Sequence, residues 1–355
     1  MTNLINDFLT SSLKRWKIFL ISFVLVFLMV VLPKLDLKSS YEMVSPQTSK
    51  VDIFEQISPK LERFKSDFTP KKQSGLIPVT QASGEYEQAA AYGVVDLETA
   101  EVLIEKDFSK RLPIASITKV MTAMVVLDLA SSLDQEFLVS ERASKMVPTK
   151  VMLKPGEKVS LELLLKSALL SSANDSAQVI KEGIDKMYKE PVFIRAMNEK
   201  AQILGMKNSH FTNPQGFDDP NHYSSVEDLA ILINYALKNY SIISEIVAKD
   251  YEDMNKNGEI RFYLNNWNGL LGVYPGVRGV KIGNTAEAGY TTAVVSERAG
   301  KKLLAVILGT PGVLERDLWT SQLLDIGFSQ VAGLQPINLT QADLKLKYNS
   351  WKYER

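Results

Sequence analysis

The chain has 355 residues, of which 45% are hydrophobic, a balance typical of folded proteins and unlike that of disordered or collagen-like chains. Lysine plus arginine and aspartate plus glutamate both number 41, so no excess charge predicts a nucleic-acid partner. The chain has no cysteine, which excludes disulfides, thiolate catalysis and cysteine-ligated zinc, and with two histidines we expect no metal site.

The first predicted element is an uncharged apolar run over residues 18–32. The basic residues just before it are Lys14, Arg15 and Lys17. Positive charge before an apolar run keeps the N-terminus in the cytoplasm. We therefore expect a cytoplasmic N-terminus (1–15) and a transmembrane signal-anchor (16–33), giving a single-pass protein of the cell membrane with its remaining residues outside the cytoplasm. A cleaved signal peptide is the main alternative, but the sequence after the run lacks the small residues of a cleavage site.

Residues 34–86 are rich in serine, proline, threonine, lysine and glutamine, which predicts an extracytoplasmic linker. A short amphipathic helix near 51–64 fits inside this linker. We expect the catalytic domain at residues 87–333 and a short polar C-terminal tail at 334–355.

Strand and helix patterns follow one another through the predicted domain. Two strands flank a turn at residues 96–99. Helical spacing of apolar residues then predicts helices beginning at Ser116 and at 161–170, 193–204 and 226–237. The pattern ends with strands at 279–282, 290–296 and 303–308 and a helix near 315–326. Strands at both ends with helices between them predict one α/β (α+β) unit whose sheet joins strands distant in sequence.

The first motif that suggests chemistry is Ser116-Ile117-Thr118-Lys119. Residues three apart share a helix face, so the lysine amine can reach the serine hydroxyl and, once desolvated, accept its proton. The pattern alone is weak, because a helix-capping serine followed by a solvated lysine gives the same letters.

Two further motifs follow along the chain. Ser172-Ala173-Asn174 lies on a turn between two helices, where a hydroxyl can relay a proton and an amide can hold a substrate carbonyl or fix the lysine. Ordinary capping is the alternative. Lys281-Ile282-Gly283 lies on a predicted strand whose edge can pair with an extended peptide and whose lysine attracts a carboxylate. An exposed strand lysine is the alternative there.

Taken together and in this order, the three motifs resemble the signature of penicillin-recognising serine enzymes. With the surrounding stretches PIASITKVMTA, LLSSANDSA and GVKIGNTAEAGYT, they make residues 92–328 similar to the serine-type D-alanyl-D-alanine carboxypeptidases, the low-molecular-mass penicillin-binding proteins. The resemblance implies a penicillin-binding-protein/serine β-lactamase-like fold, an antiparallel sheet flanked by helices with a mostly helical subdomain. It also implies peptidoglycan stem peptides as substrates, β-lactam antibiotics as inhibitors and no cofactor.

The resemblance further implies a role for each motif residue. Ser116 is expected to be the acylated nucleophile, Lys119 its general base and Ser172 a proton relay. The expected substrate-binding residues are Asn174, Lys281, Gly283, Asn284, Thr285 and Arg316. The backbone N–H groups of Ser116 and Asn284 are expected to form the oxyanion hole. For Arg316, which would hold the terminal carboxylate, a surface helix position is the alternative. The two histidines, His210 and His222, are expected to be structural.

One position departs from the family pattern, because Ile282 stands where the third motif normally has threonine or serine. That hydroxyl would donate to the substrate carboxylate, and losing such a bond costs about 1.5–3 kcal/mol. The leading expectation remains D-Ala–D-Ala carboxypeptidase activity. The alternatives are a D,D-endopeptidase with a different substrate end, and a non-catalytic module that binds cell-wall peptide or penicillin.

Overall fold

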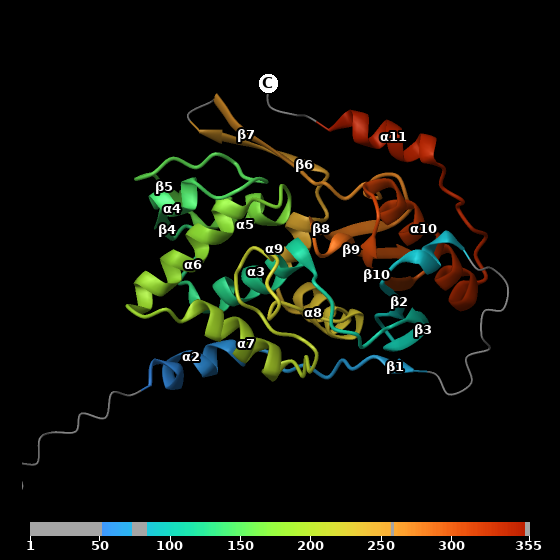
Figure 1. The fold of residues 1–355 in the computed structure, drawn as a ribbon, viewed down its shortest axis with the longest axis horizontal. Helices are drawn as coiled ribbons and strands as arrows, with labels where there is room; N and C mark the ends of the chain where they lie inside the picture. The colour runs from blue at the N-terminus through green and yellow to red at the C-terminus, as the bar shows by residue number, and fades with distance from the viewer. Residues whose placement is uncertain (1–51, 73–83, 257–258, 352–355) are drawn as a thin grey trace, which may run out of the picture. The chain divides into compact units, whose positions relative to one another are not determined.

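The computed structural model describes residues 52–72, 84–256 and 259–351 (Figure 1). The expected cytoplasmic N-terminus and membrane anchor, residues 1–33, lie outside these ranges. Among the helices within them, none combines the length and the apolar character that a membrane crossing needs.

A six-stranded sheet lies at the centre of the described part, in the order β1-β3-β2-β10-β9-β8. The strands are β1 (Lys71–Lys72), β2 (Ala91–Asp96), β3 (Glu101–Lys106), β8 (Val277–Thr285), β9 (Gly289–Arg298) and β10 (Lys301–Thr310). Neighbours are antiparallel except the short β1, which runs parallel to β3. Strand β2 pairs with β10, Ala91 opposite Leu308. The predicted antiparallel sheet, joined by strands distant in sequence, is therefore confirmed.

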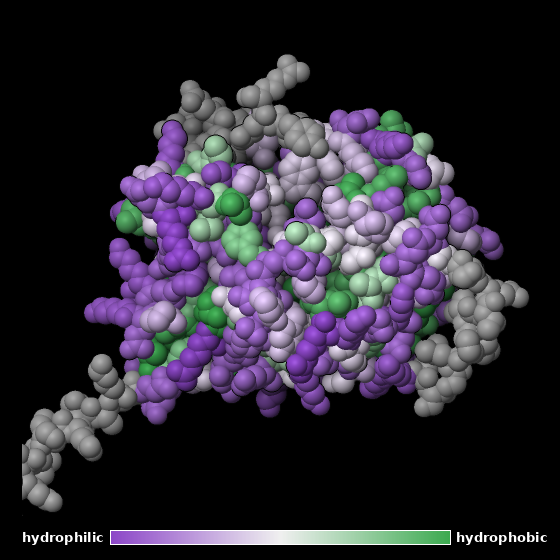
Figure 2. Space-filling view, in the orientation of Figure 1, coloured by the Kyte–Doolittle hydropathy of each residue, from purple (hydrophilic) through white to green (hydrophobic). Residues whose placement is uncertain are grey.

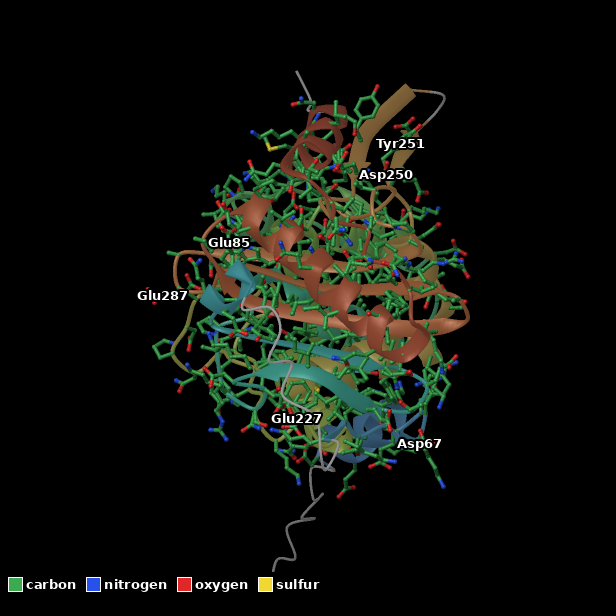
Figure 3. The ribbon with its side chains drawn as sticks, turned by 90° about the vertical axis from the view of Figure 1, so that its right-hand side faces the viewer. Asp67, Glu85, Glu227, Asp250, Tyr251 and Glu287 are labelled. Atoms are coloured by element: carbon green, nitrogen blue, oxygen red, sulfur yellow. The ribbon has the colours of Figure 1, made fainter. Side chains whose placement is uncertain are left out.

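Two layers of helices cover this sheet, because alternate residues of a strand point to opposite faces. On β10, Leu303, Ala305 and Ile307 pack with α10 (Val313–Ala332). Leu304, Val306 and Leu308 belong to the other core, which includes α8 (Val226–Asn239). Figure 3 shows α10 crossing the outer face of the sheet. On the face shown in Figure 2, hydrophilic residues cover most of the surface and apolar residues form small groups.

The second half of the domain is mostly helical and surrounds α3 (Thr118–Leu129), which is buried on nearly all sides. Such a helix has no polar face and is typical of a domain core. The other helices in this half are α4 (Glu141–Ser144), α5 (Leu161–Leu169), α6 (Asn174–Tyr188), α7 (Phe193–Ile203) and α9 (Ser241–Val247). Two small antiparallel sheets complete it: β4 (Glu136–Leu138) with β5 (Lys158–Ser160), and the hairpin of β6 (Tyr251–Lys256) with β7 (Glu259–Asn265). The sheet and the helical half confirm the α+β architecture.

The predicted linker is wrong for residues 52–72, which belong to the folded unit. Helix α2 (Ile53–Leu61) buries Phe54, Ile57 and Leu61 at helical spacing in the main core. The buried Lys200 ammonium donates to the carbonyl of Leu61 at 2.6 Å. Apolar side chains on one helix face are buried in preference to remaining in water. The segment therefore packs on the domain, although its composition is rich in polar residues.

The predicted C-terminal tail also differs from the structure. Residues 341–350 form α11, whose capping box joins Thr340 and Asp343 and whose Leu344 is completely buried. Figure 1 shows α11 in red beside α10 and near the base of β6. The segment is thus part of the fold, because one buried leucine and several polar contacts hold a helix that has little amphipathic pattern of its own.

Candidate active site

Ser116 lies in a 3-10 turn, η3 (Ala115–Ile117), that leads directly into α3. Ala115 just before it has a positive φ of 48°, a strained conformation that places the serine at the turn. Strand β8 passes very close to this turn. A Cβ built on Gly283 would lie 2.6 Å from the Ser116 amide nitrogen, so only glycine permits this approach. The approach brings the edge of β8 next to the backbone N–H of Ser116.

Lys119 is buried below this turn and makes three short contacts. Its Nζ donates to Ser116 Oγ at 2.7 Å, to Asn174 Oδ1 at 2.8 Å and to the carbonyl of Gln215 at 2.9 Å. Burial lowers the pKa of Lys119 well below its usual range, and the charge of Lys281 lowers the pKa further. An amine with a lowered pKa, in contact with a hydroxyl, can remove that hydroxyl proton.

The turn between α5 and α6 brings the second motif to the same place. Ser172 has a φ of 60° and lines the pocket next to Ser116. Its hydroxyl makes no hydrogen bond to another described residue and is therefore available to a substrate. The amide of Asn174 accepts from Lys119 and donates to the carbonyl of Val147 at 3.1 Å, so its first role is to hold the lysine.

Lys281 is also buried, but its position differs from the expected one. Its Nζ donates to the carbonyl of Ile282 at 3.0 Å, and the side chain does not line the pocket. Burial lowers the pKa of Lys281 to about 7, with a further contribution from the charge of Arg316. Its charge acts on the site by lowering the pKa of Lys119.

The pocket in front of Ser116 has a volume of about 420 Å³, within the range of small-ligand sites. It is lined by Ser116, Pro148, Thr149, Ser172, Asn174, Trp267, Ile282, Asn284, Tyr290, Val313, Arg316 and Trp351. Of these, Ile282 and Asn284 point from the same side of β8, because they are two residues apart. The isoleucine therefore gives the pocket an apolar wall where the family pattern has a hydroxyl.

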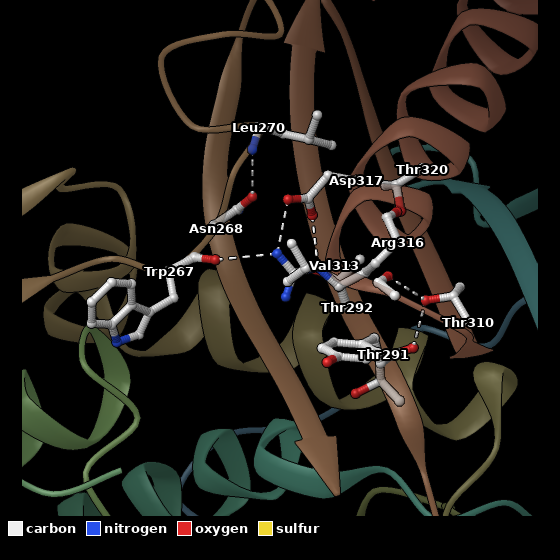
Figure 4. A network of polar contacts seen from close by, with 12 residues as sticks. Trp267, Asn268, Leu270, Thr291, Thr292, Thr310, Val313, Arg316, Asp317 and Thr320 are labelled. Atoms are coloured by element: carbon white, nitrogen blue, oxygen red, sulfur yellow. Dashed lines mark hydrogen bonds and ion pairs between the residues drawn. The ribbon is translucent and has the colours of Figure 1, made fainter. Parts of the chain in front are cut away.

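Arg316 closes one end of this pocket and is 1% exposed, so the surface-helix alternative is wrong. Its Nε and Nη2 donate to the carboxylate of Asp317 at 2.7 and 2.8 Å, and Nη2 also donates to the carbonyl of Trp267 at 3.3 Å (Figure 4). The third nitrogen, Nη1, has no partner among the described residues. A guanidinium held in this way can bind a carboxylate with its free edge.

Thr285 is the predicted binding residue that the structure places elsewhere. It does not line the pocket. Its hydroxyl donates to Asp218 Oδ1 at 2.5 Å and accepts from the amide of Ala288 at 3.1 Å. The side chain belongs to the opposite face of β8 from Ile282, which is three residues earlier, and so it cannot replace the missing hydroxyl.

Both histidines make structural contacts, as expected. His222 is buried, and its Nε2 lies 2.8 Å from Thr118 Oγ1 while its Nδ1 accepts from the amide of Thr212. Burial lowers the pKa of His222 to about 4, so the ring is neutral at pH 7. His210 Nδ1 lies 2.6 Å from the carbonyl of Asn221.

Several pocket residues carry no motif and were missed in the sequence. Pro148 and Thr149 belong to a segment held by Asp175, whose carboxylate accepts from the amides of Val151 and Leu153. Trp267 and Trp351 come from a loop before β8 and from the C-terminus. The sequence did contain one indication, because each of these two tryptophans lies in a polar segment. Tryptophan side chains are buried more often than the polar side chains around them.

The comparisons with known proteins agree with this geometry. The family model described as D-alanyl-D-alanine carboxypeptidase matches residues 79–312. D-alanyl-D-alanine carboxypeptidase DacF of Bacillus subtilis is 33% identical over 273 residues, covering 75% of this chain and 69% of that protein. The D-alanyl-D-alanine endopeptidase of Escherichia coli is 30% identical over 257 residues, covering 69% of this chain and 79% of that protein.

Solved structures have the same fold. The Streptomyces K15 DD-transpeptidase matches with a TM-score of 0.63 and 29% identity, covering 68% of this chain and 97% of that one. Penicillin-binding protein D2 of Listeria monocytogenes, in its cefotaxime-bound form, matches with a TM-score of 0.60 and 30% identity, over 68% of this chain and 97% of that one.

The fold and the Ser116–Lys119 arrangement define the class of penicillin-recognising serine enzymes. Within this class the matches fix the family. The chain belongs to the D-alanyl-D-alanine carboxypeptidase family and is a serine peptidase with D-Ala–D-Ala carboxypeptidase function.

Proposed function

We propose that the enzyme removes the terminal D-alanine of peptidoglycan stem peptides through an acyl-enzyme on Ser116. The observation that carries this proposal is the 2.7 Å contact between Ser116 Oγ and a buried Lys119 whose pKa is lowered. Ser116 Oγ attacks the carbonyl carbon of the penultimate residue, and its proton passes to Lys119 Nζ. Backbone N–H groups of Ser116 and Asn284 receive the developing negative charge.

The remaining steps use the other pocket residues. The peptide C–N bond breaks, and the leaving amine takes a proton that Ser172 relays from Lys119, so that D-alanine departs. Water then attacks the ester, the peptide acid leaves and Ser116 regains its proton. Asn174 holds Lys119, Gly283 lets the substrate backbone lie along β8, and Lys281 supports the lowered pKa of Lys119. Arg316 binds the terminal carboxylate.

Acylation by benzylpenicillin tests this proposal directly. We expect the full chain in detergent to gain the mass of one penicilloyl group, because a β-lactam is attacked as the peptide would be. Ser116→Ala should gain none, and the control Ser131→Ala, at an exposed position, should match the parent. The same three proteins are then assayed for D-alanine release from a peptide ending in D-Ala–D-Ala. An adduct on folded Ser116→Ala, or a parent that neither reacts nor releases D-alanine, would contradict the proposal and favour the non-catalytic alternative.

We propose further that residues 16–33 anchor the enzyme in the cell membrane with the folded unit outside the cytoplasm. The uncharged run and the basic residues before it support this arrangement. Because residues 52–72 pack on the domain, the linker to the anchor is residues 34–51. The full chain should remain in the membrane fraction after alkaline carbonate extraction, and a chain beginning at residue 34 should not. Recovery of both in the same fraction would refute the anchor.

A further inference from the structure

The C-terminal strap, residues 341–351, reaches the active site from outside the matched family region. The family model ends at residue 312, whereas Trp351 lines the pocket in front of Ser116. The strap consists of α11 and the residue after it. It therefore adds to this site a wall that comes from the far end of the chain.

A buried leucine and an ion pair hold the strap on the domain. Thr340 and Asp343 cap the start of α11, and Leu344 is completely buried in the core beneath α10. Lys347 forms an ion pair with Asp250, at the start of hairpin β6–β7. Figure 3 labels Asp250 at the base of this hairpin, near α11. The buried leucine and this ion pair fix the position of the last turn of α11, after which Trp351 reaches the pocket.

Tyr348 connects the strap to the arginine of the pocket. Its hydroxyl donates to Asp317 Oδ2 at 2.8 Å, the same carboxylate that holds two nitrogens of Arg316. Gly269 leaves the space for this contact, because a Cβ there would lie 2.1 Å from Asp317 Oδ2 and 2.6 Å from the Tyr348 ring. The tyrosine thus completes the hydrogen bonding of a buried carboxylate that orients Arg316.

Trp351 packs on the other residue that contacts the arginine. Its ring meets that of Trp267 edge to face, with centroids 5.1 Å apart, and the carbonyl of Trp267 accepts from Arg316. The indole N–H of Trp351 is buried and has no partner among the described residues. Trp351 therefore forms the wall of the pocket at the Arg316 end, and its indole N–H is a hydrogen-bond donor without a partner among the described residues.

We propose that the C-terminal strap restricts the leaving group to a single residue with a free carboxylate. This inference rests on the proposed function of the site. With the terminal carboxylate on Arg316, any further residue would extend past the guanidinium. At this end the pocket is lined by Trp267 and Trp351, whose rings pack edge to face, while Asp317, which accepts from Tyr348, holds the other edge of the guanidinium. The strap selects against the extended leaving group of a cross-linked peptide, which an endopeptidase must accept. Trp351 is the specificity-determining residue, and Tyr348 is a positioning residue that acts through Asp317.

Two peptides that share the acyl half test this selection with the full chain. One ends in D-Ala–D-Ala, and in the other a glycine is joined through an amide to the last carboxylate. We expect Trp351→Ala to raise the ratio of kcat/KM for the extended peptide to that for the free acid by about tenfold, because the wall is removed. Tyr348→Phe should raise KM for the free acid about tenfold with little change in kcat, because Arg316 is less firmly oriented. Its rate on the extended peptide should not change.

Leu346→Ala is the matched control, since Leu346 lies on the same helix and is 72% exposed. It should behave as the parent in both assays, and thermal melting checks that every variant is folded. An unchanged ratio in folded Trp351→Ala, or equal losses on both peptides in Tyr348→Phe, would overturn the inference and leave the proposed function standing. A parent that cleaves neither peptide would refute the proposed function itself, and the selection with it.

Discussion

The two ends of the pocket are assembled in different ways. At the acylation end, the side chains of Ser116 and Asn174 both accept hydrogen bonds from Lys119 Nζ. At the carboxylate end, Ile282 provides an apolar wall, and Arg316 is held by Asp317 and by the carbonyl of Trp267. The first end keeps the family motifs, and the second end departs from them.

This difference follows from what each end has to do. Proton transfer needs donor and acceptor within hydrogen-bond distance, so the residues of the acylation end cannot be exchanged for others. Holding a carboxylate needs only a positive group and a suitable shape, which several combinations of residues can supply. The loss of one hydroxyl at Ile282 is therefore compatible with function where a buried arginine remains. The following variants test the two ends separately.

Lys119→Arg should have the largest effect, because it changes the acylation end. Burial, helped by the charge of Lys281, lowers the pKa of Lys119 well below its ordinary 10.5, which raises the fraction of the amine that is neutral at a given pH. Arginine stays charged and cannot accept the serine proton. We expect benzylpenicillin acylation to fall by about 10²–10⁴-fold, measured by stopped-flow or intact mass. The parent rate should fall with decreasing pH as Lys119 gains its proton.

Lys145→Arg, at an exposed position, is the control for this variant and should react as the parent does. A Lys119→Arg variant that reacts at the parent rate would refute the general-base role.

Arg316→Lys should have a smaller and more selective effect at the carboxylate end. Lysine keeps a positive charge but loses the two parallel bonds to Asp317, so the charge is less firmly placed. We expect kcat/KM for a peptide ending in D-Ala–D-Ala to fall by about 10–100-fold. The same peptide with a C-terminal amide should react as with the parent enzyme. Equal losses on acid and amide would show that Arg316 does not bind the carboxylate.

Ile282→Thr should have the smallest effect, and it should be a gain. The new hydroxyl would donate to the substrate carboxylate and raise kcat/KM for the free acid by about tenfold. Ile282→Val is the matched control, because valine has the shape of threonine without the hydroxyl. If the two variants release D-alanine at the same rate, the apolar wall does not limit the present activity.

The acylation end could be predicted from the sequence because its residues lie in short motifs. A spacing of three on a helix places Lys119 next to Ser116. The helical patterns on either side of Ser172 placed that residue on a turn, and the structure shows it lining the same pocket. The strands and their pairing across the chain were also predictable, since β2, β9 and β10 are long apolar runs.

The carboxylate end could not be predicted in the same way. Trp267, Tyr348 and Trp351 act through contacts between segments that no local pattern relates. The face of the sheet on which the Thr285 side chain lies depends on the pairing register of β8 with β9. A shift of this register by one residue would place the side chain on the opposite face. The packing of residues 52–72 was missed because three buried side chains outweigh a polar composition.

The pairing of β2 with β10 also has a consequence for how the protein folds. Ala91 and Leu308 are neighbours in the sheet but about 200 residues apart in the chain, and pairing at such separation makes folding slow. The hairpin of β2 and β3 is synthesised early, before β10, the second strand with which the apolar β2 pairs. Until β10 is made, this edge is open to pairing with other chains. The β8 edge beside Ser116 is connected to β2 through β9 and β10, so the pocket is complete only when these three C-terminal strands have joined the sheet.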